Sequence, residues 1–199
     1  MKLPILARAA ALAAALPLFT SIAAAQGGLP MTDGSHLLSL GFGGGVIVPT
    51  GDASNTFKDG VTGQAFVLVH LGPLPALRFN LGYDKFDYKD ALGLPGAHTN
   101  ILSGTGGLSF DLIGGPIRPY ITAALGAFDV NSVVNAVNTS SVSKVNFGID
   151  GGGGISLHFG RVSGFAEGRV QNVYTRNSGV ISAKSIQSIP VSFGLLFGL

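Results

Sequence analysis

Three features of the 199-residue sequence predict an all-β fold, an eight-stranded antiparallel up-and-down transmembrane β-barrel. First, apolar residues alternate with small or polar ones through eight segments, as in strands whose two faces meet different surroundings. Second, most of these segments exceed the usual strand length of globular proteins and match the roughly 9–11 residues that a tilted strand needs to cross a bilayer. Third, the connections alternate between short turns and longer polar segments, which is the layout of membrane barrels.

The composition favours a membrane protein over a soluble domain. Only 11% of the residues are charged, whereas 46% are hydrophobic and 31 residues are glycine. Soluble domains carry about 25% charged residues and about 7% glycine. High hydrophobicity with low charge excludes an intrinsically disordered chain. Because the sequence contains no Cys, it also excludes a disulfide scaffold and a Cys-ligated metal site.

The first 25 residues are predicted to be a secretory signal peptide. Lys2 and Arg8 form its positive end, residues 9–19 its apolar core, and 23–25 (Ala-Ala-Ala) a small-residue cleavage site. The alternative, a membrane anchor, is disfavoured because the apolar run falls short of the ~20 residues of a spanning helix.

Cleavage after residue 25 changes the charge balance of the chain. It removes two of the 12 Lys and Arg residues, so that 10 basic residues face 10 acidic ones and the mature chain is neutral. A neutral chain gives no support to a nucleic-acid partner. We expect residues 26–35 to be a flexible lead-in and residues 36–199 to form an outer-membrane β-barrel domain.

Strand positions follow from the period-two pattern in chain order. In the first four segments one parity is large and apolar, and the other holds Gly, Ser, Thr or charged residues. The last three segments show the same contrast. The segment 117–128 is ambiguous, since either Ile121, Ala123 and Leu125 or Tyr120, Thr122 and Phe128 could face outward; we favour the first set. The predicted strands are 36–48, 61–71, 77–88, 100–112, 117–128, 145–159, 164–174 and 185–199.

The connections predict which end of each strand faces outside. Short Gly- or Pro-rich turns are expected at 72–76, 113–116 and 160–163. Four longer polar connections are expected to be extracellular loops, at 49–60, 86–99, 129–144 and 175–184.

The apolar face is predicted to meet lipid and the polar face to line the lumen. A soluble barrel buries its apolar face and carries its charges outside, but the polar face here has too few charges for a solvated surface, and the narrow interior of an eight-stranded barrel suits Gly and Ser. The predicted lipid-facing residues are Leu38, Leu40, Phe42, Val67, Val69, Phe79, Leu81, Leu108, Phe110, Phe147, Ile149, Phe193 and Leu195. The predicted charged residues of the lumen are Arg78, Asp84, Asp111, Asp150, Glu167 and Arg169.

Buried charges require partners, so the lumen residues are expected to pair. Arg78 and Asp111 both lie near short turns on adjacent predicted strands and are candidates for an ion pair. Folding 145–159 against 164–174 brings Asp150 near Gln171 and, diagonally, Arg169. The alternative is a set of scattered polar groups wetted by trapped water; both interpretations imply a packed interior.

Three stretches resemble the small outer-membrane β-barrel domain family, the OmpA/OmpX-like eight-stranded barrels. They are RPYITAALGAF (118–128), NFGIDGGGGISLHFGRVSGFAEGRV (146–170) and the chain end SFGLLFGL (192–199). The last is similar to the C-terminal signal that the barrel-insertion machinery recognises in that family. Ser192, Gly194, Phe197 and Leu199 match it by position, although Phe is usual where Leu199 stands.

Some eight-stranded barrels are lipid A-modifying enzymes, but the histidines here give little support to that function. His36, His70 and His158 are predicted near the periplasmic ends of their strands, away from the outer leaflet. His98 lies in a long loop, where HTNI does not match the His-x-Ser-Asn motif of the deacylases. We expect no enzyme, no cofactor and no metal site.

The function that the sequence favours is that of an integral protein of the bacterial outer membrane. It has a structural or surface-interaction role and a closed, polar-lined lumen. Its expected partners are outer-membrane lipid, the barrel-insertion machinery at the C-terminal strand, and an extracellular ligand at loops 49–60 and 129–144. The alternatives are a narrow pore or transporter of small hydrophobic molecules, and a lipid A-modifying enzyme.

Overall fold

The protein forms eight long strands in a computed structural model that describes residues 37–72, 74–89, 97–134, 140–174 and 185–199. The predicted signal peptide, the lead-in, His36 and the connection 175–184 lie outside the described residues. The strands are β1 (Leu38–Thr50), β2 (Gly60–Val69), β3 (Ala76–Asp87), β4 (His98–Asp111), β5 (Ile117–Val134), β6 (Ser140–Phe159), β7 (Val162–Tyr174) and β8 (Ser185–Gly198).

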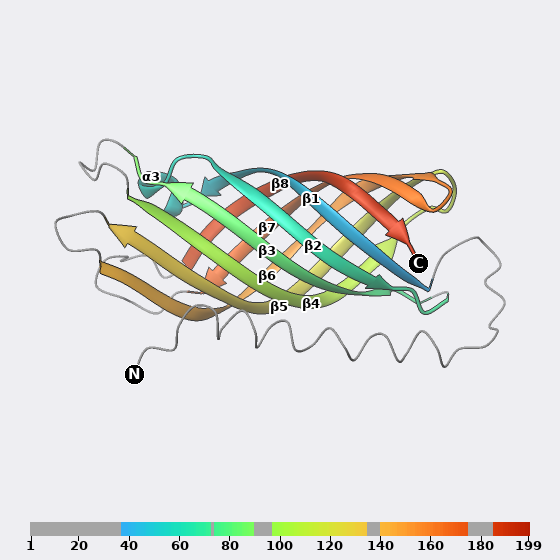
Figure 1. The fold of residues 1–199 in the computed structure, drawn as a ribbon, viewed down its shortest axis with the longest axis horizontal. Coiled ribbons are helices and arrows are strands. Elements are labelled where there is room, and N and C mark those ends of the chain that lie inside the picture. The colour runs from blue at the N-terminus through green and yellow to red at the C-terminus, as the bar shows by residue number, and fades with distance from the viewer. Residues whose placement is uncertain (1–36, 73, 90–96, 135–139, 175–184) are drawn as a thin grey trace. The chain divides into compact units, whose positions relative to one another are not determined.

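The strands close into one antiparallel barrel in chain order (Figure 1). Each strand pairs with its neighbours in the sequence, and β8 returns to pair with β1, for example Phe197 with Leu40 and Val191 with Val46. The predicted fold class, an eight-stranded antiparallel up-and-down barrel, is confirmed. Closure leaves no unpaired sheet edge between β1 and β8, which in an open sheet would be a site of aggregation.

The two ends of the barrel differ in their connections. At one end, here the turn end, tight turns join the strands, and Gly72 and Gly160 adopt positive φ angles of 69° and 72° there. The other end, here the loop end, carries the connection 51–59 with the short helix α3 (Ala53–Thr56). No helix among the described residues has the length and apolar character needed to cross a membrane.

One predicted loop is wrong. Residues 129–134 and 140–144 belong to β5 and β6, so the connection between these strands is confined to 135–139. Register pairs such as Asp129 with Val145 and Val130 with Lys144 continue the ladder beyond the predicted strand ends. The polar residues of 129–134 and 140–144 therefore belong to the sheet and not to a long loop.

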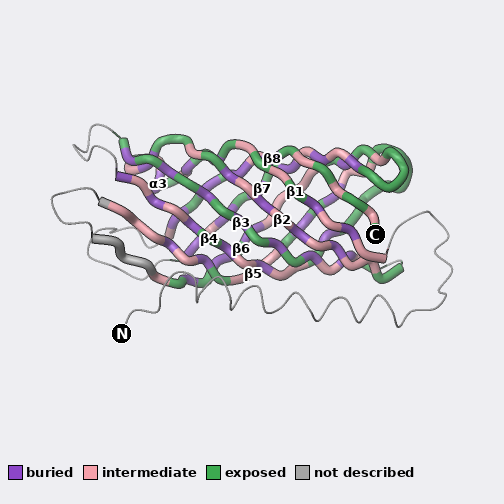
Figure 2. Tube along the Cα trace, viewed as in Figure 1, coloured by how far each residue is buried: buried purple, intermediate pink, exposed green. Residues whose placement is uncertain are grey.

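Burial alternates along every strand, so that each has an outward and an inward face (Figure 2). All residues predicted to face lipid lie on the outward side, where they are exposed or partly exposed. In β5, Ile121 and Leu125 are exposed, whereas Tyr120 and Phe128 are buried. The outward face of this strand is therefore the one that we favoured from the sequence.

Glycines allow the walls to approach the interior side chains. A Cβ at Gly154 would lie 2.7 Å from the Tyr120 hydroxyl, and one at Gly41 would penetrate the Phe66 ring. Other glycines, such as Gly63 and Gly168, would meet nothing within 4 Å and lie on the outward face. Glycine thus provides space for interior side chains at inward positions such as Gly41 and Gly154, whereas at Gly63 and Gly168 a larger residue would meet no other part of the barrel.

Candidate functional site in the barrel interior

The Glu167 carboxylate is the centre of a buried polar network. Arg78 donates to both of its oxygens, from Nη1 at 2.5 Å and from Nη2 at 3.0 Å. The Tyr120 hydroxyl donates to it at 2.9 Å, and Gln64 Nε2 does so at 3.3 Å. Arg169 Nε lies 3.2 Å from it. Arg78 and Glu167 are 2% and 3% exposed, so these contacts are shielded from bulk water.

Strand parity places these side chains in the lumen. Gln64, Arg78, Tyr120 and Glu167 each occupy an inward position on β2, β3, β5 and β7, respectively. Gly154 on β6 stands opposite Glu167 in the register, and its missing side chain leaves room for the Tyr120 hydroxyl. The network therefore connects strands that are not neighbours in the sheet.

A second group of contacts lies beside the first. Arg169 Nη1 is 3.5 Å from Asp150 Oδ1. Asp84 accepts hydrogen bonds from Thr62 Oγ1 at 2.6 Å and from Gln171 Nε2 at 3.3 Å. Asp150 and Gln171 are direct register partners. The interior thus contains the proximity of Asp150, Gln171 and Arg169 that the sequence suggested.

The interior charges do not balance. Two guanidinium groups, of Arg78 and Arg169, face three buried carboxyl groups, of Asp84, Asp150 and Glu167. Glu167 and Asp150 form ion pairs, whereas Asp84 accepts hydrogen bonds from the neutral Thr62 and Gln171. Asp84 is therefore the carboxyl group with the weakest compensation by positive charge.

Two sequence predictions about the lumen charges are corrected. Asp111 has the inward parity but is exposed, because it ends β4 at the turn end, beyond the packed part of the interior. Arg78 pairs with Glu167 and not with Asp111. The long Arg78 side chain reaches across the lumen from β3 to β7, a contact that pairing between adjacent strands does not anticipate.

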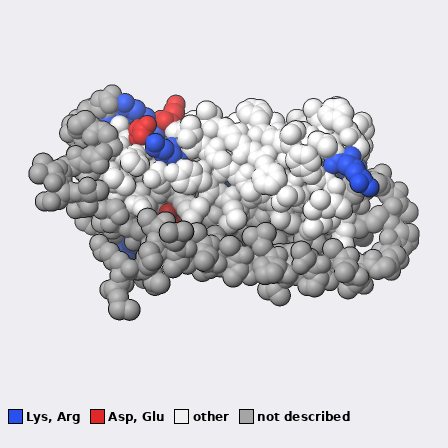
Figure 3. All heavy atoms as spheres, viewed as in Figure 1, with Lys and Arg blue, Asp and Glu red and all other residues white. Residues whose placement is uncertain are grey.

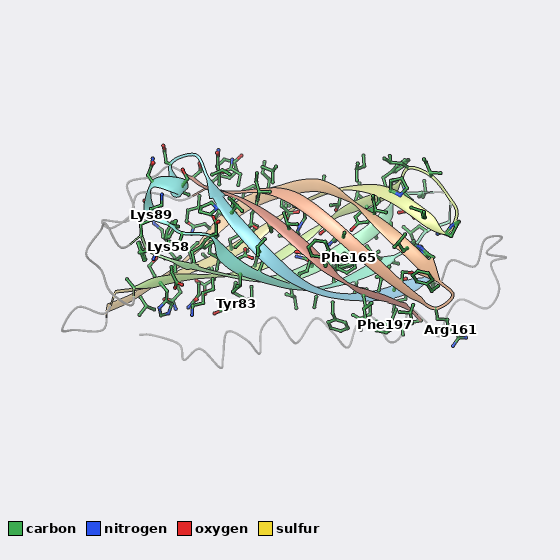
Figure 4. The ribbon with its side chains drawn as sticks, turned by 90° about the horizontal axis from the view of Figure 1, so that it is seen from above. Lys58, Tyr83, Lys89, Arg161, Phe165 and Phe197 are labelled. Atoms are coloured by element: carbon green, nitrogen blue, oxygen red, sulfur yellow. The ribbon has the colours of Figure 1, made fainter. Side chains whose placement is uncertain are left out.

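Aromatic groups bound the network toward the turn end. The Arg78 guanidinium carbon lies 4.0 Å above the Phe66 ring centroid, within the range of a cation–π interaction. Phe66 packs edge-on against Phe165, with ring centroids 5.3 Å apart, and these rings form a buried cluster with Leu68. In Figure 4, Phe165 lies along the barrel wall between the charged ends marked by Lys58 and Arg161.

An apolar cluster fills the interior at the loop end, which the sequence did not predict. Phe57 comes from the connection 51–59, and the other members include inward residues of β1, β3, β4, β5, β7 and β8. The lumen is thus apolar at the loop end, whereas its middle part is polar. The signal in the sequence is that the polar parity turns apolar near the loop ends, at Ile47, Phe86, Ile101, Phe128, Val173 and Ile186.

The arrangement crosslinks and fills the barrel. Gln64 and Glu167 are 103 positions apart in the sequence, and Arg78 and Glu167 are 89 apart, so the contacts join distant segments. An ion that moves along the lumen would have to separate these buried pairs. Gln64, Thr62 and Tyr120 join the interior contacts without having been predicted as site residues, because neutral polar residues on a strand carry no specific motif.

Histidines and acidic residues are spread over both ends. His98 begins β4 at the loop end, whereas His158 lies in the last turn-end part of β6 and His70 directly follows β2. Within the part of the chain that the structure describes, no group of three or more His, Asp or Glu side chains is arranged to hold a metal ion.

Comparisons with known proteins identify the fold. No protein-family model matches the sequence, and no curated protein does so. Among solved structures, the Neisserial surface protein A matches with a TM-score of 0.64 and 16% identity, over 84% of this chain and 100% of that chain. A second match is the attachment invasion locus protein Ail of Yersinia pestis, with a TM-score of 0.49 and 11% identity over 83% of this chain and 100% of that chain. A third is the N-terminal β-barrel domain of Pseudomonas aeruginosa OprF, with a TM-score of 0.46 and 16% identity over 82% of this chain and 98% of that chain. The chain therefore has the fold of the small eight-stranded outer-membrane β-barrels, the OmpA/OmpX-like type that its motifs resemble.

Proposed function

We propose that the protein is an integral outer-membrane β-barrel with a closed lumen and a structural or surface-interaction role. The observation that carries the proposal is the inverted polarity of the barrel. Large apolar side chains such as Phe193, Leu125 and Leu108 are exposed, and the Arg78–Glu167 ion pair is buried. Apolar surface costs about 25 cal/mol per Å² in water, so this outer face is stable only against lipid or another apolar surface.

The distribution of surface charge supports a membrane-spanning orientation. On the face shown in Figure 3, charged side chains gather near the two ends of the barrel and uncharged atoms form the surface between them. Lys58, Lys85 and Lys89 are exposed at the loop end, and Arg161 is exposed at the turn end. Charges beyond both edges of an apolar band are typical of barrels that cross a bilayer.

The outer membrane is the location that the rest of the chain favours. A closed barrel satisfies all of its backbone polar groups within the sheet, as a spanning structure must. The predicted signal peptide would direct export. Strand β8 carries Ser192, Gly194 and Phe197 and is followed by Leu199, and these four residues resemble the signal for the barrel-insertion machinery. Outer-membrane lipid is then the principal partner.

A surface-interaction role would reside at the loop end. The connection 51–59 and the outer parts of β5 and β6 are described at this end, and they include most of the two regions expected to meet an extracellular ligand. The buried ion pairs favour a closed barrel over the narrow pore or transporter. His70 and His158 lie at the turn end, away from the expected outer leaflet, and this position favours a protein without lipid A chemistry.

Fractionation together with gel migration tests the proposal. The protein should sediment with the outer membrane, resist extraction by alkaline carbonate, and migrate faster before boiling than after it. A protein found soluble in the periplasm would refute the proposal. Lipid A mass spectra that change on deletion of the gene would instead support the enzymatic alternative, and steady single channels of the wild-type barrel in planar bilayers would support the pore.

A further inference from the structure

The connection between β1 and β2 places an aromatic ring in the mouth of the barrel. Phe57 belongs to this connection and not to the wall, yet it is only 2% exposed. Its ring centroid lies 5.5 Å from that of Phe86 and 5.0 Å from that of Tyr88. The apolar cluster to which it belongs includes wall residues of six strands, so Phe57 is buried among inward-facing apolar side chains at the loop end.

Backbone contacts hold this connection against the end of β3 and the residues that follow it. The Lys58 amide donates to the Asp87 carbonyl at 2.8 Å, and the Lys89 amide donates to the Thr56 carbonyl at 3.1 Å. Phe57 and Tyr88 form an isolated antiparallel bridge, and Lys58 and Lys89 accordingly lie together at this end in Figure 4. Helix α3 is one short turn that brings Ala53, itself buried, against the same cluster.

The apolar cluster and the polar network occupy successive levels of the lumen. On β3 the inward residues run from Phe86 in the cluster through Asp84 to Arg78 in the network. On β4 they run from Ile101 in the cluster to Ser103, which faces Gly82 of β3 in the register. Ser103 is buried. Because it stands opposite Gly82, which lies between Phe86 and Arg78 on β3, it lies between the two levels.

We propose that the lumen is closed by two seals in series, an outer apolar seal centred on Phe57 and an inner polar seal centred on the Arg78–Glu167 pair, each sufficient alone. An apolar constriction blocks ions by excluding water. The polar network blocks them because the buried charges of Arg78 and Glu167 already pair with each other. The expected effect on channel conductance rests on the proposed membrane function. The expected labelling of a thiol inside the lumen does not.

Cysteine accessibility tests each seal separately. The sequence has no Cys, so Ser103→Cys introduces the only thiol, between the seals. The outer seal is removed by Phe57→Ala, and the inner one by the double variant R78A/E167A. Phe193→Ala is the matched control, because it makes the same chemical change on the outward face. Thiol labelling by a small charged methanethiosulfonate is measured in detergent micelles.

We expect either opened seal to raise the labelling rate of the S103C thiol about tenfold or more over the S103C parent, because thiol modification follows access. F193A should leave the rate unchanged. In planar bilayers, F57A and R78A/E167A should each remain without steady channels, and the combined variant should conduct.

Several outcomes would overturn the proposal. If F57A or R78A/E167A alone conducts, the seal removed in that variant is the one that closes the barrel, and the other is not sufficient. A combined variant that is labelled but does not conduct would show a further barrier, and an S103C thiol that stays unreactive in F57A would show that Phe57 is no seal. If F57A fails to fold, Ala53→Glu is used in its place, because a buried glutamate there displaces the same connection. Failure of the wild-type barrel to insert into bilayers would refute the membrane function and leave the labelling result intact.

Discussion

Removal of the Glu167 carboxylate is predicted to destabilise the barrel strongly. In Glu167→Ala, Arg78 loses the carboxylate with which it forms an ion pair, and Tyr120 and Gln64 lose an acceptor. Removing one partner of a buried ion pair costs about 3–5 kcal/mol, since the other charge stays buried and uncompensated. Both partners here are almost fully buried, so we expect a loss of this size in the free energy of unfolding.

The network also predicts an asymmetry between the two partners. Arg78→Ala leaves Glu167 beside Arg169 at 3.2 Å, so its carboxylate stays compensated and R78A should cost less than E167A. Replacing both residues by apolar ones, as in R78M/E167L, should cost less than E167A, because no uncompensated guanidinium is left at position 78, although Tyr120 and Gln64 still lose their acceptor.

Urea titration of the folded barrel in micelles, followed by heat-modifiable gel migration, measures these free energies of unfolding. Asp111→Ala is the control, since this carboxylate is exposed at the turn end, and we expect it to change stability by no more than about 0.5 kcal/mol. If E167A cost under about 1 kcal/mol, as exposed pairs do, the lumen would be wetted by water and the reasoning from burial would be refuted.

Three other substitutions test the faces and the interior. Leu108→Arg, on the outward face, should lower the free energy of unfolding by about 2–4 kcal/mol if it lies near the bilayer midplane; Ile113→Arg, in a turn, should cost far less, and equal effects would show that the apolar band is misplaced. Asp84→Asn should leave urea stability unchanged or raise it, because it removes the least compensated buried charge; a loss as large as that of E167A would contradict this. Gly194→Ala should destabilise the barrel, since its Cβ would lie 2.6 Å from the Gly43 Cα, whereas Gly168→Ala meets open space and should be neutral or stabilising in the same assay.

Local pattern was sufficient to predict the strands and their faces. Period-two alternation identifies the outward side directly, because lipid selects large apolar residues at every second position. Even in 117–128, where both parities contain apolar residues, the outward side is the one with Ile121 and Leu125. The fold therefore follows from information that each strand carries by itself.

The interior was less predictable because it depends on contacts between distant strands. Arg78 could be assigned to the lumen from parity, but its partner on β7 depends on how the barrel closes and on side-chain length. Asp111 had the right parity and the wrong depth, since parity does not report how near a residue lies to the barrel end. The β5–β6 extension was missed because its polar residues match a loop composition, although Val130 continues the inward face.

The interior network is a property of the closed barrel and not of any hairpin within it. Neighbouring strands meet through the ladder, but Glu167 on β7 contacts Gln64 on β2 and Arg78 on β3, which requires β8 to have paired with β1. Before closure these charges would face water, where they need no partners. The same few charges therefore carry no desolvation cost in the open sheet and depend on one another once the lumen forms. This dependence explains how a chain with only 11% charged residues can contain several of them in its interior.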